Sequence, residues 1–272
     1  MYHGISKQLD DHLHPYFRTV TSPERFEQQM RFLSENGYEV LTLSEAVHFL
    51  QDQSSHHSDK VSASSEKQRP IVVITFDDGL RDFYGAAFPV LEKFGFKATV
   101  FLTSGLIDKT FPTGSECLRE TEIKELAIKG IEFGSHTVNH PQLKSLSKNE
   151  IVDELANSKK RIEEILGHPM ELFSYPYRFP EEDTNFTKML STLLLEQGYS
   201  MGVTTIIGRM KTNDNPLFLK RLPVNDCDDR PLFQVKLEGG YDWLHTFQLI
   251  SKKIRALIRK DKADVFSPQS NC

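Results

Sequence analysis

The stretch IVVITFDDGLRDFYGAAFPVLEKFGFKATVFLTS, residues 71–104, decides the fold class. It begins with an apolar run at 71–75, continues with apolar side chains at helical spacing as far as Gly95, and ends in a second apolar run at 97–104. A strand, a helix and a strand in this order form a β-α-β unit, whose two strands are parallel. The stretch therefore predicts a parallel sheet with helices packed against it.

The same alternation continues along the rest of the chain, where short links join the expected elements. Helices are predicted at about 22–37, from residue 44, and at 121–129, 147–166 and 184–197. Strands are predicted at 38–43, 131–135, 171–176, 199–205 and 218–224. Strands that alternate with helices in this way favour an α/β barrel or an open doubly wound sheet.

The composition limits the class of protein. The chain has 272 residues, of which 38% are hydrophobic and 26% charged, and its net charge of -5 provides no basic excess for binding nucleic acid. The three cysteines are widely spaced and odd in number, so neither a disulfide framework nor a zinc knuckle is expected. The sequence contains no run of about 18 apolar residues, the length needed to span a bilayer, and its N-terminus has no apolar signal region. We expect a cytoplasmic protein as the chain is written, or an extracytoplasmic one if its N-terminus is truncated.

We expect one domain over residues 1–260, interrupted by a flexible insertion and followed by a disordered tail at 261–272. The insertion is predicted at 51–69, which is rich in serine and nearly free of apolar residues. Residues 241–260 have apolar side chains at helical spacing with lysines and arginines around them. This pattern fits a helix on the barrel wall, and it also fits a peripheral membrane contact, which would make the protein membrane-associated. The oligomeric state is left open.

Two groups of polar residues follow predicted strands. Asp77 and Asp78 would point to opposite faces of a regular strand, so both serve one site only if the strand ends there. His136 and His140 are four residues apart, which brings both imidazoles to one face if the backbone is helical. Parallel α/β sheets collect their ligands at the carboxyl ends of neighbouring strands, where both groups lie. Two histidines and one carboxylate, with the remaining positions open to water, have the composition of a hydrolytic zinc centre, although an exposed helix face is the alternative for the histidines. A second carboxylate that does not bind the metal would be available as a general base.

Three motifs, TFDDG at 75–79, SHTVNH at 135–140 and FSYPY at 173–177, resemble in order and spacing those of the polysaccharide deacetylase family. This family is also known as the NodB homology domain and as carbohydrate esterase family 4. The N-terminal YHGIS is most similar to the branch that contains the bacterial biofilm poly-N-acetylglucosamine deacetylases. The similarity runs from Tyr2 to Leu257, which is nearly the whole chain.

The resemblance implies a distorted (β/α) barrel with seven or eight parallel strands. It also implies a carbohydrate substrate, from whose N-acetylhexosamine units acetyl groups are removed by metal-activated water attack. That substrate would be a glycan or glycan precursor of the exopolysaccharide or cell-envelope type. By residue, the resemblance implies that Asp77 is the catalytic base and that the Tyr177 backbone N–H stabilises the oxyanion. It further implies that one divalent ion, expected to be Zn²⁺, is bound by Asp78, His136 and His140.

The chain departs from the family pattern in three places. The arginine that normally precedes Pro-Tyr is absent, and Arg221, at the end of a late predicted strand, is the candidate to replace it, although a surface arginine is the alternative. Arg178 stands where the branch usually has a glycine, and as a candidate substrate-binding residue it could pair with an acidic group of the substrate or narrow the cleft. Tyr175 is a second candidate substrate-binding residue, with a core or rim position as the alternative. The general acid is not identified, because His245, the nearest match, also fits the apolar stripe of a helix.

Two other functions stay open at this point. One is a non-catalytic carbohydrate-binding protein on the same fold, which the missing arginine and general acid would favour. The other is a related metal-dependent amidase or esterase with a different substrate.

Overall fold

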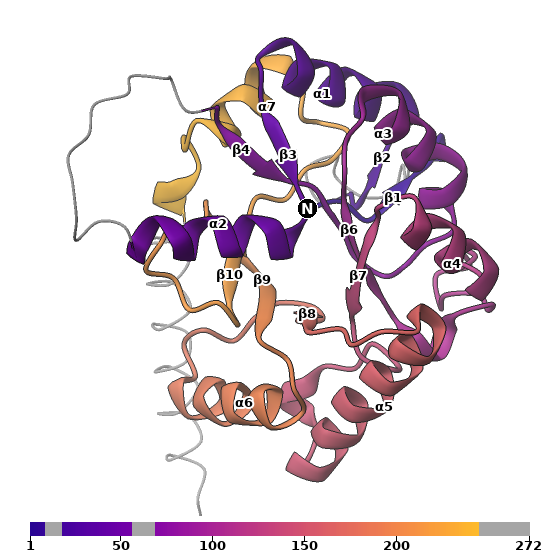
Figure 1. The fold of residues 1–272 in the computed structure, drawn as a ribbon, viewed down its shortest axis with the longest axis vertical. Coiled ribbons are helices and arrows are strands. Elements are labelled where there is room, and N and C mark those ends of the chain that lie inside the picture. Colours follow the sequence, from indigo (N-terminus) through magenta and orange to yellow (C-terminus); the bar gives the residue numbers. More distant parts are fainter. Residues whose placement is uncertain (9–17, 56–68, 245–272) are drawn as a thin grey trace, which may run out of the picture.

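The computed structural model describes residues 1–8, 18–55 and 69–244. Its main sheet has six strands in the order β10-β9-β8-β7-β6-β5, and every neighbouring pair is parallel. The strands are β5 (Thr75–Phe76), β6 (Thr99–Leu102), β7 (Glu132–Ser135), β8 (Leu172–Ser174), β9 (Met201–Ile207) and β10 (Leu219–Arg221). The sheet curls, and helices cover its outer side (Figure 1). The predicted distorted α/β barrel is confirmed, although its main sheet has six strands where seven or eight were expected.

The helices lie between successive strands of the sheet and around them. The longer ones are α1 (Pro23–Glu35), α2 (Leu43–Ser55), α3 (Phe88–Phe94), α4 (Glu120–Ile128), α5 (Lys148–Leu166), α6 (Thr184–Glu196) and α7 (Arg230–Leu237). Three single turns are the π-helical η3 (Phe83–Ala87) and the 3₁₀-helical η4 (Ser104–Leu106) and η5 (Leu143–Ser145). Helix α5 begins with a capping box, in which the Ser147 N–H donates to the Glu150 carboxylate at 2.7 Å and the Ser147 hydroxyl accepts from the Glu150 N–H.

Two short parallel pairs form separate two-stranded sheets beside the main sheet. They are β1 (Gly4–Ile5) with β2 (Val20–Thr21), and β3 (Glu39–Leu41) with β4 (Ile71–Val73). The run at 71–75, expected as one strand, is divided at Ile74: β4 pairs with β3, whereas β5 pairs with β6. The division lets the chain change partners at the edge of the curled sheet.

The first two residues close the barrel at the carboxyl ends of its strands. The Tyr2 N–H donates to the Thr75 carbonyl at 2.8 Å, and the Asp77 N–H donates to the Tyr2 carbonyl at 3.0 Å. On the other side, the Met1 amino group donates to the Leu222 carbonyl at 2.9 Å, and Val224 N–H donates to the Met1 carbonyl at 3.0 Å. This segment therefore lies between the ends of β5 and β10, and it adds a further strand-like connection to the six strands of the main sheet.

Two expectations about peripheral segments fall partly outside the described residues. Helix α2 continues to Ser55, so the start of the predicted insertion at 51–69 is helical and that part of the prediction is wrong. The rest of the insertion from residue 56 to 68, most of the predicted helix at 241–260 and the predicted tail at 261–272 lie outside the described residues. Within the described ranges, no helix is both long and apolar enough to cross a bilayer.

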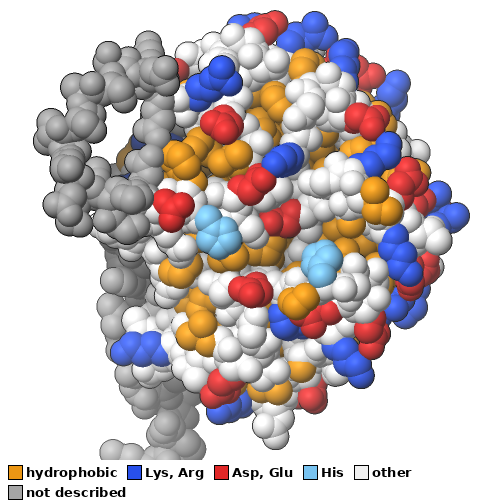
Figure 2. Space-filling model, viewed as in Figure 1, with side chains coloured by type: hydrophobic (Ala, Val, Ile, Leu, Met, Phe, Trp, Pro, Cys, Tyr) orange, Lys and Arg blue, Asp and Glu red, His pale blue; other side chains and the backbone are white. Residues whose placement is uncertain are grey.

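The surface visible in Figure 2 has acidic and basic side chains interspersed over it. No basic patch dominates this face in the described part of the chain, which agrees with the net charge of -5.

Candidate metal centre and active site

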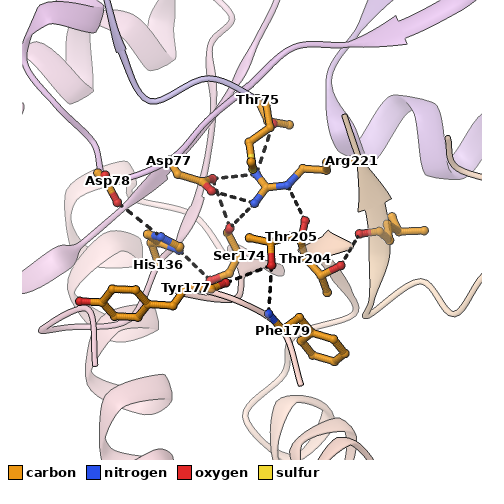
Figure 3. Close-up of polar contacts among 12 residues, drawn as sticks. Thr75, Asp77, Asp78, His136, Ser174, Tyr177, Phe179, Thr204, Thr205 and Arg221 are labelled. Carbon is orange, nitrogen blue, oxygen red and sulfur yellow. Dashed lines mark hydrogen bonds and ion pairs between the residues drawn. The ribbon is translucent and has the colours of Figure 1, made fainter. Parts of the chain in front are cut away.

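The two adjacent aspartates lie where strand β5 ends and the chain turns sharply. Asp78 has a φ of 73° and Gly79 a φ of 68°, so both adopt the left-handed conformation. A side chain on Gly79 would also collide with Leu102, because an added Cβ would lie 2.8 Å from its Cδ2. The turn directs the Asp77 and Asp78 carboxylates to different partners (Figure 3).

Asp77 forms a buried ion pair with Arg221 from the end of β10. The Arg221 Nη1 and Nη2 groups each donate to one Asp77 oxygen at 2.7 Å, which is a bidentate contact. Ser174 donates to Asp77 Oδ1 at 3.2 Å and accepts from Arg221 Nη2 at 3.1 Å, and Arg221 Nε donates to the Thr204 carbonyl at 3.0 Å. Burial by itself would raise the pKa of Asp77, but the Arg221 charge and hydrogen bonds outweigh it and hold the pKa well below its ordinary value. Asp77 is therefore an ionised carboxylate held in one orientation.

Asp78 faces the two histidines instead. Its Oδ1 atom lies 3.5 Å from His136 Nε2 and 3.4 Å from His140 Nε2. The three ligand atoms lie within 4.8 Å of one another. The His136 Nδ1 atom contacts the Ser174 carbonyl at 2.8 Å, and because a carbonyl only accepts, Nδ1 carries the proton and Nε2 has a free lone pair. This is the orientation that a metal-binding histidine requires.

The electrostatics of this cluster fit a bound cation. Asp78 Oδ1 is buried and has no hydrogen-bond partner among the described residues. Burial, followed by the charge of Asp77, raises the pKa of Asp78 to about 7, and burial lowers the pKa of His136 to about 3. A neutral imidazole nitrogen and a nearby carboxylate oxygen without a hydrogen-bond partner are ligand atoms that a divalent transition-metal ion binds.

The loop that carries the histidines is not helical, so the helical condition under which the two imidazoles were expected to share one face is not met. Thr137 and His140 have φ values of 70° and 55°, and the resulting turn brings the two imidazole rings to a centroid distance of 4.8 Å. Glu154 of α5 anchors the loop, because its carboxylate accepts from the Val138 N–H at 2.8 Å and from the Asn139 N–H at 3.0 Å. The histidines meet because of a tight, anchored turn.

Left-handed backbone is concentrated around this site. Among the described residues, five that are not glycine have a positive φ, and four of them belong to the site: Asp78, Thr137, His140 and Tyr177. Such conformations are costly for residues with a Cβ and persist only where the surrounding structure imposes them. Their gathering at one place indicates a site whose geometry is maintained for function.

The remaining predicted site residues lie in different environments. Tyr177 is 51% exposed, and its ring lies 4.4 Å from the His140 ring, whereas Arg178 is exposed and forms an ion pair with Glu182 at 2.8 Å. Tyr175 is only 3% exposed and packs edge-on against Phe179 at 5.0 Å. The prediction that Tyr175 binds substrate is therefore wrong, because its ring is part of the core.

Two further residues of the site, Ser174 and His3, were not predicted from the sequence. Ser174 joins the two halves of the site, since its hydroxyl contacts the Asp77–Arg221 pair and its carbonyl fixes the His136 ring. Its only signal in the sequence was its place in the third motif. His3 is brought to the site by the N-terminal segment: burial lowers its pKa to about 4, and it interacts electrostatically with Asp77. Its signal was the N-terminal YHGIS, which sequence reasoning used only as a mark of resemblance.

Known proteins resemble this chain in sequence and in fold. The polysaccharide deacetylase family model matches residues 64–195. YxkH of Bacillus subtilis (strain 168), which is named as a polysaccharide deacetylase, is 34% identical over 227 residues, covering 83% of this chain and 70% of YxkH. The poly-beta-1,6-N-acetyl-D-glucosamine N-deacetylase of Staphylococcus aureus (strain MSSA476) is 24% identical over 214 residues, covering 75% of this chain and 68% of that protein. The solved structure of the Streptococcus pyogenes deacetylase PplD in complex with acetate is 25% identical, has a TM-score of 0.71, and the match covers 87% of this chain and 96% of PplD.

Proposed function

The chain belongs to the polysaccharide deacetylase family, and from this premise we propose that it is a metal-dependent hydrolase that removes N-acetyl groups from N-acetylhexosamine units. The substrate is a glycan or glycan precursor of the exopolysaccharide or cell-envelope type. The named activity of the Staphylococcus aureus relative, on poly-N-acetylglucosamine, supports this choice. One observation carries the proposal: of two adjacent aspartates, one is ionised and paired with Arg221, and the other faces two histidines with an oxygen that lacks a hydrogen-bond partner.

The metal would be held by Asp78 Oδ1, His136 Nε2 and His140 Nε2, and we propose Zn²⁺, which prefers this mixture of imidazole and carboxylate. When bound, the ion supplies Lewis-acid polarisation of the acetamide carbonyl and a lowered pKa of water in the site. The Ser174 carbonyl keeps His136 in the tautomer that presents Nε2, and Glu154 keeps the His140 loop in place.

Asp77 moves the proton. Water adds to the acetamide carbon while Asp77 accepts its proton, and Arg221 and Ser174 hold the carboxylate oxygens in position for this transfer. When the carbon–nitrogen bond breaks, Asp77 returns the proton to the leaving nitrogen, so the products are acetate and a primary amine on the sugar. The depressed pKa of Asp77 keeps the residue in the accepting form at neutral pH.

Tyr177 contributes to the proposed reaction through its backbone N–H. Its N–H has no hydrogen-bond acceptor within the described ranges, which supports a role as donor to the oxyanion that forms on the carbonyl oxygen. Loss of a donor of this kind costs about 3 kcal/mol of transition-state stabilisation in other hydrolases. Arg178 follows directly and is 56% exposed in its side chain, which supports its proposed role as a substrate contact at the rim.

One of the two observations that favoured a non-catalytic binding protein no longer does so. That alternative rested partly on the missing arginine of the third motif, and Arg221 lies against Asp77 with two contacts of 2.7 Å. A related amidase or esterase would differ in substrate alone.

Acetate release tests the proposal. Purified protein loaded with zinc is incubated with β-1,6- and β-1,4-linked N-acetylglucosamine oligomers, and acetate is measured over time. We expect release that a chelator abolishes and that added zinc restores. No acetate from any of these oligomers, from a lipid-linked N-acetyl sugar or from a nucleotide sugar would contradict the proposal.

A further inference from the structure

The segment between η4 and α4 forms a hairpin that the proposed reaction does not use. The Cys117 N–H donates to the Lys109 carbonyl at 2.9 Å, and the Phe111 N–H donates to the Ser115 carbonyl at 2.7 Å. Thr110 and Glu116 are bridged as antiparallel partners between these two contacts. The hairpin therefore spans residues 109–117, with Phe111 close to its tip.

This hairpin is fixed to the chain segment that carries the two aspartates. The Leu118 N–H donates to the Gly79 carbonyl at 2.8 Å, and the Arg81 N–H donates to the Glu116 carbonyl at 2.8 Å. The Arg81 side chain adds ion pairs with Glu116 at 2.6 Å and with Glu122 of α4 at 2.9 Å. The position of the hairpin relative to Asp78, one residue before Gly79, is therefore set by several independent contacts.

Phe111 extends from the hairpin to the metal-binding histidine. Its ring lies 5.5 Å from the His140 ring at an interplanar angle of 69°, while the Tyr177 ring lies 4.4 Å from the same imidazole. Among the ring pairs of the described residues, Phe111 and Tyr177 each pair with His140 and not with each other. Phe111 is partly exposed and Tyr177 is 51% exposed. Two accessible aromatic rings therefore flank a residue of the metal centre.

We propose that Phe111 is a substrate-contacting residue, whose ring stacks on the sugar next to the one being deacetylated. The C–H face of a pyranose is apolar, and a flat aromatic ring held by a fixed hairpin covers it with little loss of side-chain freedom. The inference rests on the proposed function and deepens it, because a neighbouring-sugar contact makes an oligomer a better substrate than a single N-acetyl sugar.

The competing role for Phe111 is purely structural: it would hold the His140 ring in its metal-binding orientation. The two roles predict different measurements. A substrate contact affects KM for oligomers and leaves zinc affinity unchanged, whereas a support for His140 affects zinc affinity and kcat.

The experiment compares Phe111→Ala, Phe111→Leu and Phe111→Tyr on a β-1,6-linked N-acetylglucosamine pentamer and on a single N-acetyl sugar. Phe111→Leu is included because it keeps an apolar side chain in the hairpin and therefore serves as the second variant if the alanine variant fails to fold. Phe94→Ala is the matched control, because Phe94 is also partly exposed and stacks on another ring, Phe96 at 5.8 Å, at the end of α3.

We expect Phe111→Ala and Phe111→Leu to raise KM for the pentamer by about 5- to 30-fold, with kcat within about twofold of wild type and unchanged zinc affinity. Phe111→Tyr and Phe94→Ala should behave like wild type, and the single sugar should be affected less than the pentamer. An unchanged KM, or a fall in zinc affinity together with kcat, would overturn the inference.

Binding without turnover separates this inference from the proposed function. Calorimetry of the zinc-loaded Asp77→Asn protein with the pentamer, with and without Phe111→Ala, should show the same 5- to 30-fold loss of affinity. If wild type releases no acetate, the proposed function fails, and this titration still decides whether Phe111 contacts the sugar.

Discussion

The Asp77–Arg221 pair makes a large contribution to stability that can be measured without substrate. In Arg221→Met an apolar side chain replaces the aliphatic part of the arginine and the guanidinium is lost, so Asp77 loses two charge-assisted hydrogen bonds of 2.7 Å. Asp77 is 2% exposed and Arg221 7%, so water does not replace the missing partner. Removing one member of a buried ion pair costs about 3 to 5 kcal/mol of unfolding free energy. For a domain of this size, that loss lowers the melting temperature by about 6 to 20 °C.

The assay is urea unfolding followed by circular dichroism, in the presence of EDTA so that metal binding does not contribute. The matched variants are Asp77→Asn and the double variant Asp77→Asn/Arg221→Met, which complete a double-mutant cycle. Because the double variant leaves no isolated charge, its loss should be smaller than the sum of the single losses by about 2 to 3 kcal/mol. A loss below about 1 kcal/mol for Arg221→Met, or single losses that simply add, would refute the assignment of Arg221 as the residue that holds Asp77.

Two further variants test the supports of the site. Glu154→Ala removes the carboxylate that accepts from the Val138 and Asn139 N–H groups, so zinc affinity should fall by about 10- to 100-fold. Zinc affinity is measured by competition with a chromophoric chelator. Unchanged affinity would show that the histidine loop needs no anchor. In Gly134→Ala the added Cβ would lie 2.7 Å from the Phe101 ring, so the unfolding free energy should fall by about 1 to 3 kcal/mol in urea titrations. Wild-type stability of this variant would mean that strands β6 and β7 separate more easily than their packing suggests.

The residues of the site were predictable where short motifs follow strands. A β-α-β pattern fixes parallel strands, and parallel strands bring their carboxyl ends to one edge, so Asp78 and His136 were expected to meet. They do, at 3.5 Å. Arg221 could be predicted by the same argument, because it lies at the end of a late strand. In the structure it contacts Asp77.

Contacts that depend on tertiary packing were not predictable. The partners of residues 1–2, which lie between β5 and β10, could not be predicted from the sequence, because such pairing depends on how far the sheet curls. Tyr175 looked like an accessible aromatic residue, but the turn after β8 directs it into the core. Phe111 lies in a loop without periodicity, and only the hairpin contacts show that it reaches His140.

The two adjacent aspartates have different tasks in the proposed reaction, and a paired measurement on two variants distinguishes these tasks. Zinc content and acetate release are measured side by side for Asp77→Asn and Asp78→Asn. We predict that Asp77→Asn binds as much zinc as wild type but releases acetate at least about 100-fold more slowly, because the base is lost. Asp78→Asn should lose both zinc and activity, because it loses a ligand. Zinc loss in Asp77→Asn together with full zinc content in Asp78→Asn, or wild-type acetate release by Asp77→Asn, would show that the two aspartates do not divide base and metal ligand between them in this way.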